Sequence, residues 1–275
     1  MHQKLIHFFI ITLLVASCSS KEVELNIPPN KEKSFEIYQE AIDAMDKNQY
    51  FYASKKFSEA EQILPKIEFS AKASLMSSYC LYLINFYPEA NASLERFLNQ
   101  YPADKNIAYA HYLIAINLYE QILDEKKDIA PLLKTKEKIK YFIKNFPNTE
   151  YALDLTFKMD LINNQLAAKE LYVAKYYITT QKWIPAINRL KIIIKDYSET
   201  VFIEEALHRL VEVYYRVGLI EEANAAAAIL GYNYNSGEWY KQSYKVLNKN
   251  YKIPKKIDLK KNDGLIKRTI KKILK

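Results

Sequence analysis

Hydrophobic residues between Ser34 and Tyr240 recur at spacings of three and four positions, and polar residues fill the positions between them. This periodicity is typical of amphipathic α-helices, because it places the hydrophobic side chains on one face of each helix. The strict alternation that would indicate β-strands is almost absent from this region. The pattern therefore predicts an all-α fold for residues 34–240.

The helical pattern is also repeated along the chain. Five segments end alike, in a large hydrophobic residue followed by proline, serine or asparagine: Leu64-Pro65, Tyr101-Pro102, Phe146-Pro147, Tyr197-Ser198 and Tyr234-Asn235. Before each ending, a large residue, a small residue and two further apolar residues recur at fixed offsets, with a partial match in the third segment. These sets are Tyr50, Ala53, Phe57 and Ala60; Tyr87, Ala90, Leu94 and Phe97; Leu132, Thr135, Ile139 and Phe142; Trp183, Ala186, Leu190 and Ile193; and Ile220, Ala223, Ala227 and Leu230.

This arrangement resembles the tetratricopeptide repeat, a helix–turn–helix unit of about 34 residues. In that repeat the small residue lets the two helices approach each other, and a proline ends the second helix. We predict a right-handed α-solenoid of about five tetratricopeptide-like helical hairpins, in which stacked neighbours bury the apolar faces. An irregular helical bundle is the alternative. The third and fourth endings follow the preceding one after 45 and 51 residues, against 37 residues for the second and fifth endings. These wider spacings predict an insertion near Leu123–Leu133 and lengthened helices around Asp154–Tyr177.

The chain begins with a pattern typical of a secretory signal peptide. Lys4 precedes the apolar run Leu5–Val15, and the small pair Ala16-Ser17 stands directly before Cys18. The last four residues of this stretch resemble the lipobox of bacterial lipoproteins, which implies that the leader 1–17 is removed and that Cys18 is lipidated. The alternatives are a single-pass anchor or an ordinary secreted chain, although a membrane span needs roughly 20 apolar residues.

Lipidation would give the chain a stable membrane attachment, because a di- or triacylated Cys18 supplies the two or more acyl chains that this requires. The residue after Cys18 is Ser19. In enteric bacteria, lipoproteins with a residue other than aspartate at this position are sorted to the outer membrane. Residues 18–33 are polar and contain Pro28-Pro29, so we predict a solvated linker between the lipid and the repeats.

The positive charge of the chain is concentrated at its C-terminal end. The formal net charge is +8, but the segment 241–275 alone contributes +11 and residues 19–240 contribute −4. An exported protein with an acidic body is not expected to bind nucleic acid. Within the basic tail, the pattern of Gly264–Lys275 predicts a short basic amphipathic helix suited to an anionic membrane surface or an acidic partner. A frayed tail is the alternative.

The chain has few residues with which to build a catalytic site. All four glycines follow residue 217, so earlier segments cannot form the glycine-rich loops that cradle phosphates. Cys80 is the second of two cysteines, and its apolar surroundings predict a buried structural thiol and no disulfide. His111 and His208 lack neighbours at metal-ligand spacing. We therefore expect neither a cofactor nor a metal, and an envelope hydrolase would need a second domain that the sequence does not indicate.

Three strings resemble the BamD family, the lipoprotein subunit of the outer-membrane β-barrel assembly machinery. They are Asn106–Tyr112; Leu166–Tyr177, followed by Trp183, Ala186, Asn188 and Arg189; and Gly237–Tyr240 with Ser243-Tyr244. The resemblance implies a scaffold that is not an enzyme, anchored by its lipid at the periplasmic face of the outer membrane. Its partners would be the barrel-forming assembly protein and accessory lipoproteins. Its substrates would be unfolded outer-membrane proteins, held by their C-termini.

The resemblance also suggests which residues bind these proteins. Asn188, Arg189 and Lys195 would lie at the interface with the assembly protein, although Arg189 could instead be a solvated helix charge. Five tyrosines on predicted helices would line a groove for substrate: Tyr38, Tyr79, Tyr82, Tyr109 and Tyr112. Tyrosine offers a large contact area with one polar tip, but for any one of these residues packing between helices is the favoured explanation. A pilotin-like lipoprotein that assembles secretins remains the alternative function.

Overall fold

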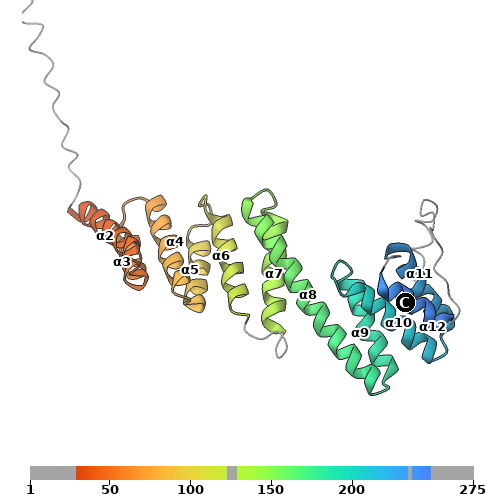
Figure 1. The fold of residues 1–275 in the computed structure, drawn as a ribbon. Helices are drawn as coiled ribbons and strands as arrows, with labels where there is room; N and C mark the ends of the chain where they lie inside the picture. Colours follow the sequence, from red (N-terminus) through yellow and green to blue (C-terminus); the bar gives the residue numbers. More distant parts are fainter. Residues whose placement is uncertain (1–28, 123–128, 235–236, 249–275) are drawn as a thin grey trace, which may run out of the picture. The chain divides into compact units, whose positions relative to one another are not determined.

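The computed structural model describes residues 29–122, 129–234 and 237–248. These residues form eleven α-helices and no β-strand, which confirms the predicted all-α class (Figure 1). The helices are α2 (Pro29–Asp46), α3 (Tyr50–Ile63), α4 (Ile67–Leu83), α5 (Tyr87–Gln100), α6 (Ile107–Glu120), α7 (Ala130–Asn145), α8 (Glu150–Thr179), α9 (Trp183–Asp196), α10 (Ile203–Arg216), α11 (Ile220–Asn233) and α12 (Glu238–Leu247). The predicted leader 1–17, the lipidation site Cys18, most of the linker 18–33 and the chain after Asn248 lie outside the described residues.

The helices follow one another along the chain in the order of five helix–turn–helix repeats, from α2–α3 to α10–α11, and α12 packs against α10 and α11. Each pair contains one of the five sequence repeats, so the predicted tetratricopeptide-like hairpins are confirmed. The predicted insertion overlaps the connection between α6 and α7, of which residues 123–128 lie outside the described part. The predicted lengthening is present in α8, which has 30 residues.

Two helix boundaries fall outside the predicted repeat region, residues 34–240. Helix α2 begins at Pro29, within the predicted linker, and α12 continues to Leu247, within the predicted basic tail. In α12, the buried Ser243 meets His208 on α10 and the buried Tyr240 lies against Gly231 on α11, and this packing outweighs the basic composition of the segment. No helix of the described ranges has both the length and the hydropathy of a membrane span.

The chain divides into two compact units, residues 1–80 and 81–275. The core of the first unit is built by α2, α3 and most of α4, with Ala41, Phe57 and Cys80 fully buried. Ser77 on α4 donates to the backbone carbonyl of Ser54 on α3 at 2.9 Å, which ties these two helices together. Burial raises the pKa of the Cys80 thiol to about 12, which confirms the predicted structural thiol.

The second unit contains two hydrophobic cores, and α8 contributes to both. Residues of α8 up to Leu166 pack with α6 and α7, whereas those from Ala167 onward pack with α9, α10, α11 and α12. Tyr197, directly after α9, packs against both cores. The long helix is therefore shared by two successive layers of hairpins.

The second helix of every pair presents its repeated residues to the interior. The small residues Ala53, Ala90, Thr135, Ala186 and Ala223 are all fully buried. Four positions later, the larger side chains of Phe57, Leu94, Ile139 and Leu190 are fully buried as well. Burying one such large side chain contributes about 1.5–3 kcal/mol, so these positions account for much of the stability of each hairpin.

Each of these second helices ends with the same hydrogen bond. The N–H groups of Leu64, Tyr101, Phe146, Tyr197 and Tyr234 donate to the carbonyl four residues earlier at 2.8–3.0 Å. Proline follows three of these five residues, and it cannot donate a further helical hydrogen bond. The recurring sequence ending is therefore a helix stop.

Four of the five turns inside the pairs use a residue with positive φ. These residues are Asn48, Asn85, Gln181 and Gly218, with φ of 58°, 62°, 59° and 85°, and each stands two positions before the second helix. After Gln181, the N–H of Lys182 donates to the carbonyl of Tyr177 at 2.8 Å. This bond belongs to the Schellman arrangement that ends many helices, usually on glycine.

Candidate functional site

Tyrosines of α6 and α8 form an aromatic cluster in the second unit. The rings of Tyr109 and Tyr112 lie 6.2 Å apart, and each contacts Tyr151 in the first turn of α8, at 5.5 and 4.6 Å respectively. Tyr82 packs against the same core as Tyr112 and Tyr151. We call Tyr82, Tyr109, Tyr112 and Tyr151 the tyrosine cluster. It unites three of the five tyrosines predicted to bind substrate.

The polar end of this cluster is held by a carboxylate. The hydroxyl of Tyr112 donates to Asp154 Oδ2 at 3.0 Å, and Lys158 Nζ lies 3.2 Å from Oδ1 of the same carboxylate. Burial raises the pKa of Tyr112, and the bond to Asp154 raises it further. The Tyr112 phenol therefore stays neutral, and the cluster can offer aromatic faces and hydroxyls to a ligand.

The other two predicted groove residues, Tyr38 and Tyr79, belong to the first unit. The ring of Tyr38 meets Phe57 edge-on at 5.3 Å and packs against the core. Its hydroxyl is buried and has no hydrogen-bond partner among the described residues. Tyr79 is half-buried on α4. Tyr38 therefore contributes to helix packing, as the alternative interpretation of the tyrosines expects.

Arg189, predicted at a partner interface, bonds within the chain. Its Nη1 lies 3.2 and 3.1 Å from the two carboxylate oxygens of Glu170 on α8. The Glu170 side chain is 15% exposed and that of Arg189 is 41% exposed. The pair links the two helices of the fourth hairpin and leaves part of the guanidinium at the surface.

Asn188 and Lys195 share an exposed face of α9. They stand seven residues apart, which is close to two helical turns, and both are exposed. Ile184, four residues before Asn188, is 73% exposed and lies on the same face. Ile184, Asn188 and Lys195 therefore form a stripe with an apolar, a polar and a cationic group, which we call the α9 stripe.

The two histidines of the described residues serve packing. His111 lies 5.1 Å from Tyr141 and 5.6 Å from Phe146, and burial lowers the pKa of its imidazole, with a smaller contribution from Lys138. His208 is buried and meets Ser243 at 2.9 Å. Within residues 29–122, 129–234 and 237–248, no group of three or more potential metal ligands is found.

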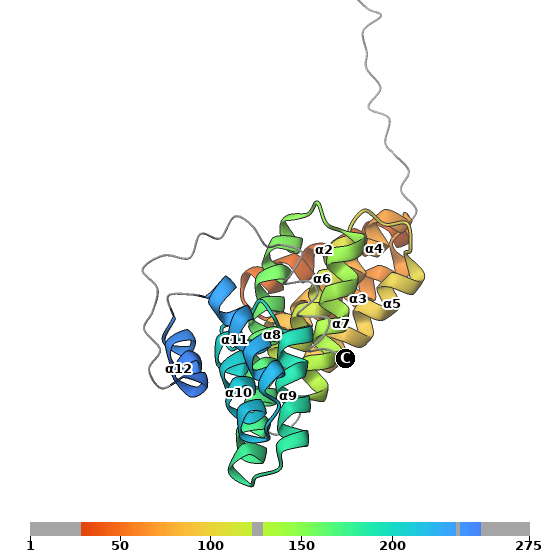
Figure 2. The ribbon, with the colours of Figure 1, turned by 90° about the vertical axis from the view of Figure 1, so that its right-hand side faces the viewer.

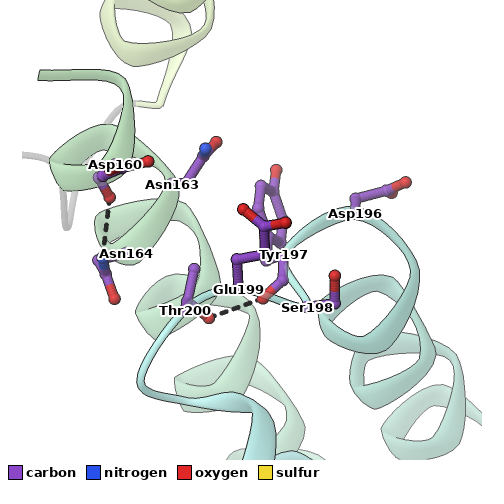
Figure 3. Close-up of a pocket in the computed structure, with 8 residues that line it drawn as sticks. All are labelled: Asp160, Asn163, Asn164, Asp196, Tyr197, Ser198, Glu199 and Thr200. Atoms are coloured by element: carbon purple, nitrogen blue, oxygen red, sulfur yellow. Dashed lines mark hydrogen bonds between the residues drawn. The ribbon is translucent and has the colours of Figure 1, made fainter. Parts of the chain in front are cut away.

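A polar pocket of about 240 Å³ opens between the middle of α8 and the connection from α9 to α10 (Figure 3). Three carboxylates line it, from Asp160, Asp196 and Glu199, together with Asn163, Asn164, Tyr197, Ser198 and Thr200. The connection is held by Val201, whose N–H donates to Asn164 Oδ1 at 3.2 Å. This is the helix ending at which serine replaces the recurring proline. We call it the acidic pocket.

Comparisons with known proteins identify the family. A family model described as YfiO, outer membrane lipoprotein, matches residues 30–229. A Rickettsia prowazekii protein named outer membrane protein assembly factor BamD is 37% identical over 242 residues, which cover 88% of this chain and 95% of that protein. A Caulobacter vibrioides protein of the same name is 35% identical over 241 residues, covering 88% and 79%. The chain belongs to the YfiO family of outer membrane lipoproteins. The BamD resemblance inferred from the sequence is thereby confirmed.

The YfiO match covers the tyrosine cluster, the α9 stripe and the acidic pocket, since all of them lie between residues 30 and 229. Cys18 precedes the match and lies outside the described residues. Membership in the YfiO family places the protein among outer membrane lipoproteins, whereas the attachment of acyl chains at Cys18 rests on the lipobox alone.

The structure of this YfiO-family chain also identifies candidate site residues that the sequence analysis did not assign to a site. Tyr151 and Asp154 complete the tyrosine cluster from the first turns of α8. Tyr172 and Tyr176, one turn apart on the same helix, are 72% and 58% exposed. Their spacing of four residues was visible in the sequence, but only the structure separates these exposed rings from the packed ones.

Proposed function

We propose that this protein is a scaffold of the β-barrel assembly machinery, held at the periplasmic face of the outer membrane by acyl chains on Cys18. The observation that carries the proposal is the YfiO match over residues 30–229, together with relatives named outer membrane protein assembly factor. A scaffold needs exposed surfaces that hold other proteins and no catalytic group. The α9 stripe is exposed and the tyrosine cluster is half-buried, and these are our two candidate surfaces.

The α9 stripe is our candidate for contact with the barrel-forming assembly protein, alongside accessory lipoproteins of the complex. Ile184 is an exposed apolar anchor, and Lys195 stands in the last turn of α9. Interface energy is concentrated in a few central anchors, while charged rims govern orientation and association rate. Arg189 contributes through the part of its guanidinium that Glu170 leaves exposed.

The tyrosine cluster is our candidate for the C-terminal ends of unfolded outer-membrane proteins. Tyr109 and Tyr112 expose part of their rings while Asp154 fixes the hydroxyl of Tyr112. Fixed aromatic rings bind apolar or aromatic peptide ends with little loss of conformational entropy. Tyr38 and Tyr79 would take part only as a separate surface of the first unit.

The test of the partner surface is co-purification of the assembly protein with a tagged copy of this chain. Lys195→Glu reverses an exposed charge on the α9 stripe, and we expect it to lower the yield of the partner severalfold. Lys140→Glu reverses an exposed charge on α7 and serves as the matched control. Equal yields for these two variants would remove Lys195 from the interface.

Arg189 needs a different design, because Arg189→Glu would also place two carboxylates together at Glu170. We therefore compare Arg189→Glu with the double variant Arg189→Glu/Glu170→Arg, which restores the internal pair with reversed orientation. If Arg189 contacts the partner, the double variant stays defective in co-purification. Recovery of the wild-type yield would show that the residue acts only by joining α8 and α9.

A further inference from the structure

An apolar stripe on α8 runs directly into the acidic pocket. Leu153, Phe157 and Leu161 follow one another at four-residue spacing and are 79%, 63% and 39% exposed. Residues three or four positions apart share a helix face, so Phe157 neighbours Asp160 and Leu161 neighbours Asn164. Exposed apolar side chains in such a row are typical of a surface that another segment covers.

The pocket end of this surface carries a local excess of negative charge. Its lining contains three carboxylates, from Asp160, Asp196 and Glu199, and no cationic side chain. Asp196 is the last residue of α9, where the helix dipole adds further negative potential. Lys136, whose Nζ lies 4.7 Å from the centre of the Tyr197 ring, interacts electrostatically with Asp196 and offsets part of this charge.

The chain itself carries a segment of complementary chemistry. Residues 249–275 lie outside the described part, and the sequence of Gly264–Lys275 predicts an amphipathic helix. Its apolar face would carry Leu265, Ile266, Ile270, Ile273 and Leu274, and its basic face Lys267, Arg268, Lys271 and Lys272. The twelve residues Gly264–Lys275 thus carry both an apolar face, which complements the apolar stripe, and positive charges, which complement the acidic pocket.

The connecting residues are long enough to reach this surface. Helix α12 starts beside the first turn of α10, since a Cβ at Gly237 would collide with the Glu204 carboxylate. Thr200 of the pocket stands only three residues before that helix begins. Helix α12 is about 15 Å long, and residues 249–263 can span up to about 50 Å. The tail can therefore return from the end of α12 to the pocket.

We propose that residues 264–275 dock on this surface of their own chain, with their apolar side chains on Leu153, Phe157 and Leu161. Lys267 and Lys272, at the two edges of this apolar face, then reach toward the carboxylates of the acidic pocket, and Arg268 and Lys271 add positive charge behind them. Docking covers the apolar stripe and neutralises the pocket. The contact is intramolecular, so it does not depend on which partner or substrate the protein binds.

The test is site-specific photo-crosslinking of the detergent-solubilised full-length protein. Phe157→p-benzoylphenylalanine places the reactive group on the stripe, and mass spectrometry identifies the peptide to which it couples. We expect coupling to residues 264–275 at low salt, reduced severalfold in 1 M salt, where the Debye length is about 3 Å. Tyr215→p-benzoylphenylalanine, at a 44% exposed site on α10, is the control for random encounters with the tail.

Charge variants test whether the crosslink depends on the carboxylates of the acidic pocket. The triple variant Asp160→Asn/Asp196→Asn/Glu199→Gln should lower coupling from position 157 severalfold. Neutralising the exposed Glu120, Glu137 and Glu221 to glutamine changes the net charge equally and should not lower it. Equal coupling from positions 157 and 215 would overturn the proposal. It would also fail if the tail bound phosphatidylglycerol vesicles but never coupled to position 157 in their absence.

Discussion

The imidazole of His208 on α10 meets the hydroxyl of Ser243 on α12, with Nδ1 and Oγ 2.9 Å apart. The Ser243 hydroxyl donates to the carbonyl of Trp239 at 2.7 Å, so Nδ1–H must be the donor to Ser243. Both side chains are buried, and the indole of Trp239 lies 5.1 Å from the imidazole. This contact joins α12 to α10, the two helices labelled in Figure 2, and adds to the hydrophobic core that they share.

Removing the Ser243 hydroxyl should weaken the packing of α12 on α10. Ser243→Ala leaves the buried Nδ1–H of His208 without an acceptor, which costs about 1–3 kcal/mol. We expect a loss of this size in the free energy of unfolding, measured by urea denaturation. Hydrogen exchange should rise in α12 before it rises in the rest of the second unit. Lys245→Ala, at an exposed site on the same helix, is the control, and equal losses in both variants would contradict the assigned contact.

The same region makes a prediction about acid stability. His208, 3.6 Å away, and then Arg209, at 2.7 Å, lower the pKa of Glu212 to about 2 from its usual 4.5. Because the folded pKa is the lower one, the ionised carboxylate stabilises the fold above pH 4.5 and loses this effect as the pH falls toward 2. Glu212→Gln should therefore be destabilising near neutral pH.

The measurement is the difference in unfolding free energy between Glu212→Gln and wild type across pH. We expect the difference to shrink between pH 4.5 and pH 2, as the wild-type carboxylate takes up its proton. Glu221→Gln, at an exposed site on α11, provides the comparison. A difference that stays constant from neutral pH to pH 2 would show that the pairing with His208 and Arg209 does not stabilise the fold.

The buried alanine of each repeat predicts a strong position effect within one helix. Ala223 on α11 is fully buried, whereas Ala228 on the same helix is exposed. Ala223→Leu forces extra methylene groups into a packed interface and should cost about 1–3 kcal/mol. Ala228→Leu should change stability by less than about 0.5 kcal/mol. Thermal unfolding of the two variants checks this, and similar losses would contradict the packing role of the small residue.

The positive-φ turns predict opposite outcomes at two equivalent positions. Gln181 holds φ at 59°, so Gln181→Gly relieves about 1–2 kcal/mol of steric cost while adding up to about 1 kcal/mol of unfolded-state entropy. We expect a net stabilisation of about 0.5–1 kcal/mol. Gly218→Ala adds a Cβ that meets nothing within 4 Å, so its expected loss of about 1 kcal/mol comes from the backbone alone. Chemical denaturation of both variants tests the pair, and a destabilised Gln181→Gly would contradict it.

The repeat offsets allowed the hairpins to be predicted because tertiary packing repeats with them. The small residue at the position of Ala53 and the large residue at the position of Phe57 recur in four of the five second helices, whereas α11 has alanine at both positions, and all of these residues are buried. The turns were less visible, since glycine, the usual sign of positive φ, stands only at Gly218. Asn48 and Asn85 occupy the equivalent positions, and only their fixed distance from the second helix marks them.

The candidate sites were predicted less completely, because a tyrosine in an amphipathic pattern can face a core or a surface. Tyr109 and Tyr112 cluster as expected, whereas Tyr38 packs on Phe57. The bond from Arg189 to Glu170 joins residues 19 positions apart, and no local pattern specifies such a pair. The acidic pocket likewise forms only when α8 meets the connection after α9.

The central claim, that this YfiO-family protein serves outer-membrane protein assembly, is tested most directly by depletion in the native bacterium. After depletion, the outer membrane is isolated, and its β-barrel proteins and other lipoproteins are quantified by mass spectrometry. We predict that barrel proteins as a class fall severalfold while other lipoproteins keep their levels. Unchanged barrel proteins, or the selective loss of a secretin as expected for a pilotin, would contradict the account.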